Sequence, residues 1–151
     1  MDTKFKIWDE VEHILKPNLF DEEIPKLLKK FFFDYCHHFS DEYAFGRNRV
    51  VFYCKHFVVK LPITDAGLSN NEWEGSVSNS KETRDNGEDV QYPRTKLFYI
   101  GENAVPIVLM EKVSFPDNDF VLPDWANSVD CGQVGFTRTG RLVAFDYGDF
   151  A

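Results

Sequence analysis

The chain has 151 residues, of which 43% are hydrophobic, so it can form one domain with a sizeable core and is not expected to be disordered. Its net charge of -8 argues against general binding to nucleic acids or anionic membranes, and no apolar run approaches the roughly 20 residues of a membrane span. The three cysteines cannot all pair, and the charged N-terminus is unlike a signal peptide, which together favour a reducing, cytoplasmic environment.

The first 40 residues predict two amphipathic helices. Apolar residues recur at helical spacing over residues 3–16, and Pro17 ends that pattern. Asp21 can cap a second helix, which carries apolar and aromatic residues at the same spacing. We expect this helical hairpin to belong to the core, with four of its side chains buried: Leu28, Phe31, Phe32 and Tyr35.

The rest of the chain predicts a sheet interrupted by one helix. Runs rich in β-branched and aromatic residues predict strands at residues 50–53, 57–61, 96–100, 106–113, 134–136 and 142–145. The last two of these strands form a hairpin. Ser69, followed three residues later by Glu72, is a capping-box pattern, which predicts a helix over about residues 70–79. Residues 80–90 are polar and aperiodic, so we expect a loop there.

Lys60 ends an apolar strand, Met110 lies in a later strand that leads into a hinge-like segment, and Asp146 lies in a turn similar to a DFG turn. In this order the three pieces resemble the nucleotide-binding lobe of a protein kinase, over about residues 43–148, and the chain is similar to small kinase-like proteins of bacteriophages. The resemblance implies an α+β fold. Its amino lobe would have an antiparallel sheet of about five strands and one packed helix, extended by the N-terminal helical hairpin and the C-terminal β-hairpin.

The same resemblance implies roles for individual residues in binding ATP. Lys60 would hold the α- and β-phosphates, and Glu74 on the predicted helix would form an ion pair with it. Met110 would be the gatekeeper, while the Glu111 carbonyl and the Val113 amide would meet the adenine edge. Taken alone, Lys60 can also be interpreted as a solvated lysine at a strand end, and the apolar run before Val113 as an ordinary core strand.

The resemblance also implies a Mg²⁺ site and a weakened catalytic loop. Asp146 would bind Mg²⁺ through its carboxylate, and Gln133, which stands where kinases have asparagine, would be the second ligand. The HRD triplet is absent, and the candidate catalytic residue is Asp130, which lies too close to Gln133 for the usual spacing. Only one glycine occurs where kinases have a glycine-rich loop, so Arg47 or Arg49 could contact phosphate there instead. We favour the alternative, an ordinary turn with solvated arginines.

Two classes of function follow from these observations. The first is a pseudokinase-type interaction module, phage-encoded and acting on a host protein in the host cytoplasm through its acidic surface. The second is an ATP–Mg²⁺-dependent phosphotransferase with a degenerate catalytic loop. We favour the first because the catalytic base and the substrate lobe are missing. We expect a single domain over 1–151, made of a helical hairpin (1–40), a kinase-like lobe to the hinge (43–113) and a catalytic-loop-like and DFG-like hairpin (114–151).

Overall fold

The computed structural model describes residues 2–77, 82–83, 89–90, 92–114, 119, 121–122 and 134–144. The helices in these ranges are α1 (Asp2–Asn18), α2 (Glu23–Tyr35), the short 3-10 helix η1 (Cys36–His38) and α3 (Asp65–Val77). The strands are β1 (Tyr43–Phe45), β2 (Arg49–Tyr53), β3 (Phe57–Pro62), β4 (Glu82–Thr83), β5 (Asp89–Val90), β6 (Thr95–Ile100), β7 (Val105–Glu111), β8 (Val113–Ser114), β9 (Val134–Thr137) and β10 (Leu142–Ala144).

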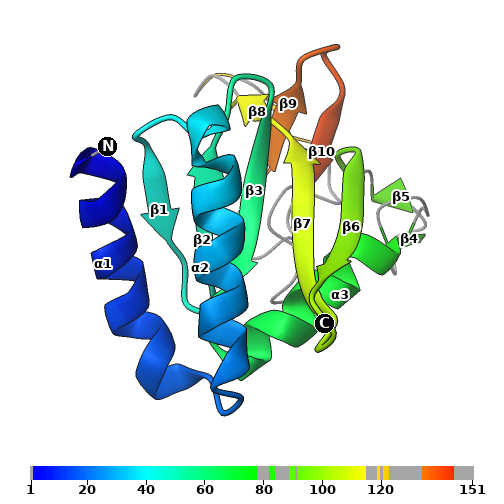
Figure 1. Ribbon diagram of the computed structural model, residues 1–151. Helices are drawn as coiled ribbons and strands as arrows, with labels where there is room; N and C mark the ends of the chain where they lie inside the picture. Colours follow the sequence, from blue (N-terminus) through cyan, green and yellow to red (C-terminus); the bar gives the residue numbers. More distant parts are fainter. Residues whose placement is uncertain are drawn as a thin grey trace.

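A five-stranded antiparallel sheet forms the centre of the molecule, with the strand order β1-β2-β3-β7-β6. A second sheet has the order β10-β9-β8, and its β9–β10 pair is the C-terminal hairpin (Figure 1). The predicted α+β class, the five-stranded sheet and this hairpin are therefore confirmed. The expectation of a loop over residues 80–90 is wrong in part, because β4 and β5 pair there as a two-stranded ladder.

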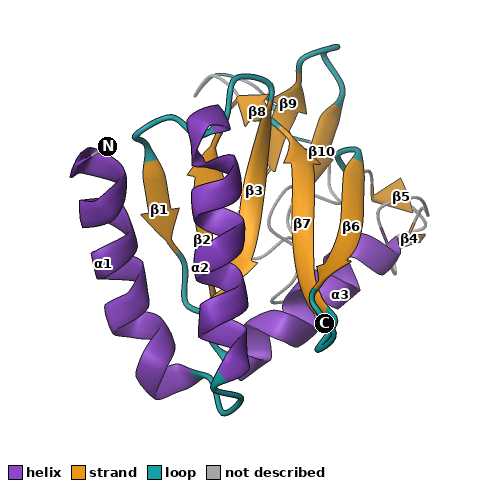
Figure 2. Cartoon of the chain, in the orientation of Figure 1, coloured by secondary structure: helices purple, strands orange, loops and turns teal. Residues whose placement is uncertain are grey.

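The main sheet separates two layers of helices, with α1 and α2 on one face and α3 across the other (Figure 2). The alternation of side chains along β3 explains how one strand serves both layers. Val59 and Leu61 pack in the cluster that contains the helical hairpin, whereas Val58 packs in the cluster on the α3 face. Lys60 follows the same alternation and contacts a side chain of α3.

The helical hairpin is part of the core, as its apolar spacing predicts. Leu28 and Phe32 are fully buried and Phe31 is 8% exposed. The centre of the Phe32 ring lies 5.1 to 5.8 Å from the centres of four other rings: Trp8, Phe33, Phe39 and Phe52. The prediction for Tyr35 is wrong, since it is 49% exposed at the end of α2, where its ring lies tilted against that of Phe31. Asp21 accepts a hydrogen bond from the Glu23 amide at 2.9 Å, at the start of α2.

α3 begins earlier than the capping-box pattern at Ser69 predicts. The Thr64 hydroxyl accepts a hydrogen bond from the Gly67 amide at 3.1 Å and donates one to Asn48 Oδ1 at 2.9 Å. Thr64 is therefore the capping side chain, and Ser69 lies inside the helix. A Cβ atom on Gly67 would lie only 2.1 Å from the Asn48 carbonyl oxygen, so glycine is required where α3 meets the strand end.

Candidate functional site: a buried ionic cluster

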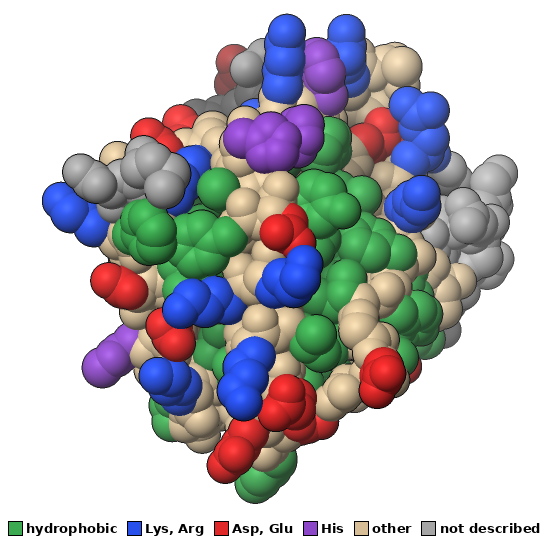
Figure 3. Space-filling view, in the orientation of Figure 1, with side chains coloured by type: hydrophobic (Ala, Val, Ile, Leu, Met, Phe, Trp, Pro, Cys, Tyr) green, Lys and Arg blue, Asp and Glu red, His purple; other side chains and the backbone are tan. Residues whose placement is uncertain are grey.

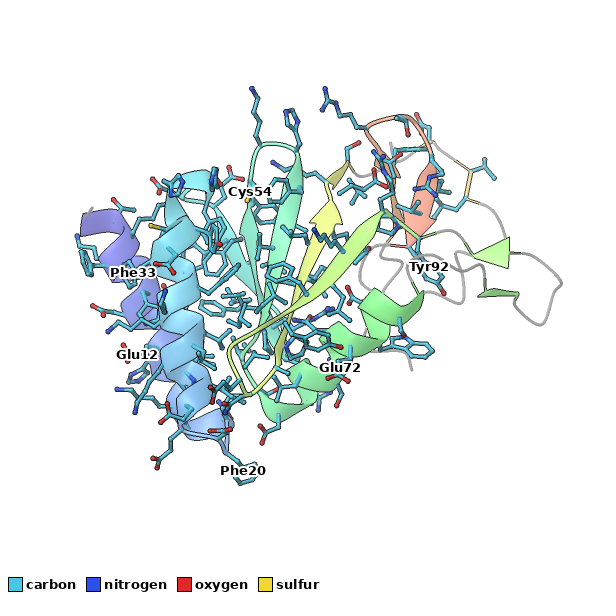
Figure 4. All side chains as sticks on the ribbon, turned by 45° about the vertical axis from the view of Figure 1, so that its right-hand side comes forward. Glu12, Phe20, Phe33, Cys54, Glu72 and Tyr92 are labelled. Atoms are coloured by element: carbon cyan, nitrogen blue, oxygen red, sulfur yellow. The ribbon has the colours of Figure 1, made fainter. Side chains whose placement is uncertain are left out.

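Four polar side chains form a buried cluster between the main sheet and α3, which we call the Lys60 cluster: Arg49, Lys60, Asn71 and Glu74. Each is at most 5% exposed, and Glu74 is fully buried. Lys60 Nζ lies 2.9 Å from Glu74 Oε1, and the Arg49 guanidinium contacts the other carboxylate oxygen. The predicted Lys60–Glu74 ion pair is therefore confirmed, and Glu72, labelled in Figure 4, is exposed.

Asn71 connects this ion pair to the backbone of two neighbouring strands. Its side-chain nitrogen donates to the carbonyl oxygens of Lys60 at 3.0 Å and Pro106 at 2.9 Å, in β3 and β7 respectively. Its side-chain oxygen accepts a hydrogen bond from Arg49 at 3.2 Å. The amide thus uses both its donor and its acceptor ends, as a buried polar side chain requires. It fixes α3 over the β3–β7 pair.

The ionic state of the cluster depends on Glu74. Burial alone would raise the pKa of Glu74, but the charges of Lys60 and Arg49 and their hydrogen bonds outweigh burial, so its pKa lies below its usual range. The carboxyl group is consequently ionised at neutral pH. The arrangement holds an ammonium and a guanidinium on one carboxylate in a low-dielectric interior.

The stability that Glu74 contributes should depend on pH in a defined direction. Its folded pKa is below the unfolded value of about 4.3, so the contribution is complete above that pH and is lost as pH falls through the folded pKa. We expect the difference in unfolding free energy between the parent and Glu74→Gln to be constant at neutral pH and to shrink in acid. Urea denaturation at a series of pH values measures it. A difference that is unchanged at about pH 2 would contradict the assignment of an ionised Glu74.

The sequence predicted that the three hinge-like residues lie in one strand, but β7 ends at Glu111 and Val113 begins β8. Met110 is 2% exposed in β7, opposite Val58, and so shares the α3 face of the sheet with Lys60. Sequence reasoning assigned a role only to the Glu111 carbonyl, but its side chain also takes part in the structure. The carboxylate accepts hydrogen bonds from the Arg94 backbone amide at 2.7 Å and from the Arg141 side chain at 3.0 Å. Val113, assigned to the adenine edge, lies in β8 and pairs with β9 in the second sheet.

The residues assigned to Mg²⁺ binding and to catalysis, Asp146, Gln133 and Asp130, lie outside the described residues, so these assignments stay predictions. Within the described part of the chain, no group of three or more histidine, cysteine, aspartate or glutamate side chains is placed to hold a metal ion. No helix in that part is long and apolar enough to cross a membrane.

Sequence reasoning assigned Arg49 the wrong role and missed Asn71. Arg49 is neither the solvated arginine that the sequence favoured nor an exposed phosphate contact, because its guanidinium binds Glu74 and Asn71 in the interior. The spacing of Asn71 and Glu74 is a signal that could have found Asn71, since residues three apart lie on the same face of a helix. No protein-family model matches the chain, and comparisons with curated proteins and with solved structures find no significant match.

Proposed function

We propose that this chain is a kinase-like module of the pseudokinase type, which acts by binding another protein and does not transfer phosphate. The observation that carries the proposal is the buried Lys60–Glu74 ion pair. The pair joins a lysine of a strand to a glutamate of a helix, beside the hinge-like strand β7. This arrangement supports the kinase-like part of the proposal. Its burial supports the non-catalytic part.

The burial of Lys60 matters because an ammonium that binds ATP must meet the phosphates. Lys60 is 4% exposed, and it shares the Glu74 carboxylate with Arg49. In this arrangement the ion pair links β3 to α3, a structural role that does not need a nucleotide. Removing one partner of such a buried pair lowers the stability of the fold strongly. The pair is therefore useful in a module without phosphotransfer activity.

The partner that we propose is a host protein with a basic surface, met by a phage-encoded chain in the host cytoplasm. The net charge of -8 supports this choice, because complementary charge speeds encounter and disfavours partners of like charge. Pull-down from host lysate is expected to yield one stoichiometric partner whose capture weakens as salt rises above about 0.15 M, where charges are screened within about 8 Å. Recovery of no partner, or of one whose capture is insensitive to salt, would contradict this part of the proposal.

The alternative function is an ATP–Mg²⁺-dependent phosphotransferase. Lys60 and Met110 favour it, since they lie on the same face of adjacent strands, as the lysine and gatekeeper of a nucleotide clamp would. In that case Asp146 would supply the carboxylate for Mg²⁺.

Isothermal titration calorimetry with Mg²⁺–ATP distinguishes the two functions. The proposed module is expected to show no saturable binding up to about 1 mM, the concentration that corresponds to about -4.1 kcal/mol of binding free energy. Saturable binding would favour the alternative, and Asp146→Ala should then remove the Mg²⁺-dependent part of the affinity. Lys60→Met would weaken that binding, whereas Lys6→Met, which changes an exposed lysine of α1, serves as the matched control.

A further inference from the structure

A pocket of about 310 Å³ opens at the end of the molecule where β2 turns into β3. Three segments line it: the β2–β3 turn, the β7–β8 junction and the β9–β10 hairpin. Four of its seven described lining residues are basic: Lys55, His56, Lys112 and Arg138. Figure 3 shows lysine, arginine and histidine side chains gathered along the same upper edge. We call this site the basic pocket.

The charge of the basic pocket is opposite to that of the chain. The chain has 25 acidic residues against 17 lysines and arginines, yet none of the described residues that line this pocket is acidic. Gathering like charges raises the free energy of the folded protein unless an anion compensates them. The composition of the lining therefore points to an anionic ligand.

Two of the cationic side chains are held in place by their own hydrogen bonds. Lys112 donates to the Cys54 carbonyl oxygen at 3.0 Å and lies 5.8 Å from the centre of the Tyr53 ring. Figure 4 shows Cys54 beside the β2–β3 turn. Arg138 Nη1 lies 3.1 Å from His56 Nδ1. Because a guanidinium only donates, Nδ1 is the acceptor in this hydrogen bond.

The remaining lining residues indicate which other chemical groups the ligand carries besides its anionic group. Ser114 adds a hydroxyl group, while Phe136 and Val113 are half-buried and supply an apolar wall. The volume lies at the lower end of the range for small-molecule sites, which is about 300 to 1,000 Å³. A phosphate ester with an adjoining apolar group fits this combination, because the dianion needs several charge-assisted donors and the apolar part needs the wall.

We propose that the basic pocket binds a small organic phosphomonoester, with the phosphate between Lys112 and Arg138 and the apolar group against Phe136. The site is separate from the Lys60 cluster, because four residues of extended chain between His56 and Lys60 span about 13 Å. The pocket shares Val113 with the positions that the kinase resemblance assigns to the adenine edge, but no residue of the Lys60 cluster lines it, so the proposal does not require the chain to bind ATP.

Phenyl phosphate is a suitable probe, followed through the backbone amides in ¹H–¹⁵N NMR spectra. We expect saturable shifts at the amides of Lys112, Ser114 and Phe136, with benzyl alcohol giving none. Arg138→Gln and Lys112→Gln should each weaken phenyl phosphate by about tenfold, the loss expected when a charge-assisted donor is removed. Lys6→Gln removes the same charge from the exposed surface of α1 and should leave the affinity within about twofold.

Three results would overturn the proposal. The first is the absence of saturable shifts up to about 10 mM phenyl phosphate, since a small-molecule site of biological use binds more tightly than that. The second is an equal loss of affinity in Lys6→Gln, which would show attraction by the overall charge alone. The third is equal affinity for inorganic phosphate and phenyl phosphate, which would remove the role of Phe136. Because Arg138 is exposed, its replacement tests the site even if Lys112→Gln fails to fold.

Discussion

A fragment that lacks residues 1–40 is expected to be unfolded or aggregated. The helical hairpin covers the face of the main sheet that carries Phe52, Leu61 and Ile107, each at most 1% exposed in the whole chain. Burying one large apolar side chain contributes roughly 1.5–3 kcal/mol, and the total stability of a domain is about 5–15 kcal/mol. Exposing this face would therefore exceed the available stability. Circular dichroism during thermal denaturation measures the outcome, and a fragment 41–151 that melts cooperatively would contradict it.

Point variants test the same interpretation without removing a segment. Phe32→Ala should lower the free energy of unfolding by about 3–5 kcal/mol, because Phe32 is fully buried among other aromatic rings. Phe20→Ala makes the same change at a side chain that is 94% exposed between α1 and α2 (Figure 4), and its effect should stay within about 0.5 kcal/mol. Equal effects of the two substitutions in urea denaturation would show that the hairpin is not packed as described.

Glu74→Gln is expected to destabilise the protein by about 3–5 kcal/mol at neutral pH, although glutamine has nearly the same shape. The substitution removes the negative charge of Glu74, which both Lys60 and Arg49 contact. Glu72→Gln is the matched control on the same helix, and since Glu72 is exposed its effect should stay within about 0.5 kcal/mol. Urea denaturation of the parent and of both variants measures these differences in unfolding free energy. A Glu74→Gln variant as stable as the parent would mean that the ion pair contributes no net stability.

The elements that follow from local sequence patterns could be predicted. The helical hairpin, the C-terminal β-hairpin and strands β2, β3, β6 and β7 depend on the spacing of apolar residues, which the sequence displays directly. The short strands β1, β4 and β5 lie in segments for which the sequence predicts no strand. The start of α3 could not be predicted in this way, since the cap at Thr64 is completed by Asn48, a residue of the turn before β2. Tyr35 continues the apolar spacing of α2, but it is the last residue of the helix and is half exposed, with its ring against Phe31.

In the candidate site, too, some residues could be predicted from the sequence, whereas others depend on how distant strands pair. The Lys60–Glu74 pair was predicted because the resemblance gave a strand lysine and a helix glutamate in a known order. The place of Arg49 depends on the register of β2 against β3, in which Arg49 lies opposite Pro62. The basic pocket likewise needs β8 to pair with β9, a pairing of segments about twenty residues apart that no local pattern indicates.

The strand order of the main sheet bears on how fast the chain folds. β2 with β3, and β6 with β7, are neighbours in sequence, so each pair can form through short loops. β3 meets β7 only after the intervening chain, which includes α3, has closed into a long loop at a cost in conformational entropy. Asn71 bonds to both strands at this join. If the join forms in the transition state, weakening the Asn71 contacts slows folding more than it speeds unfolding.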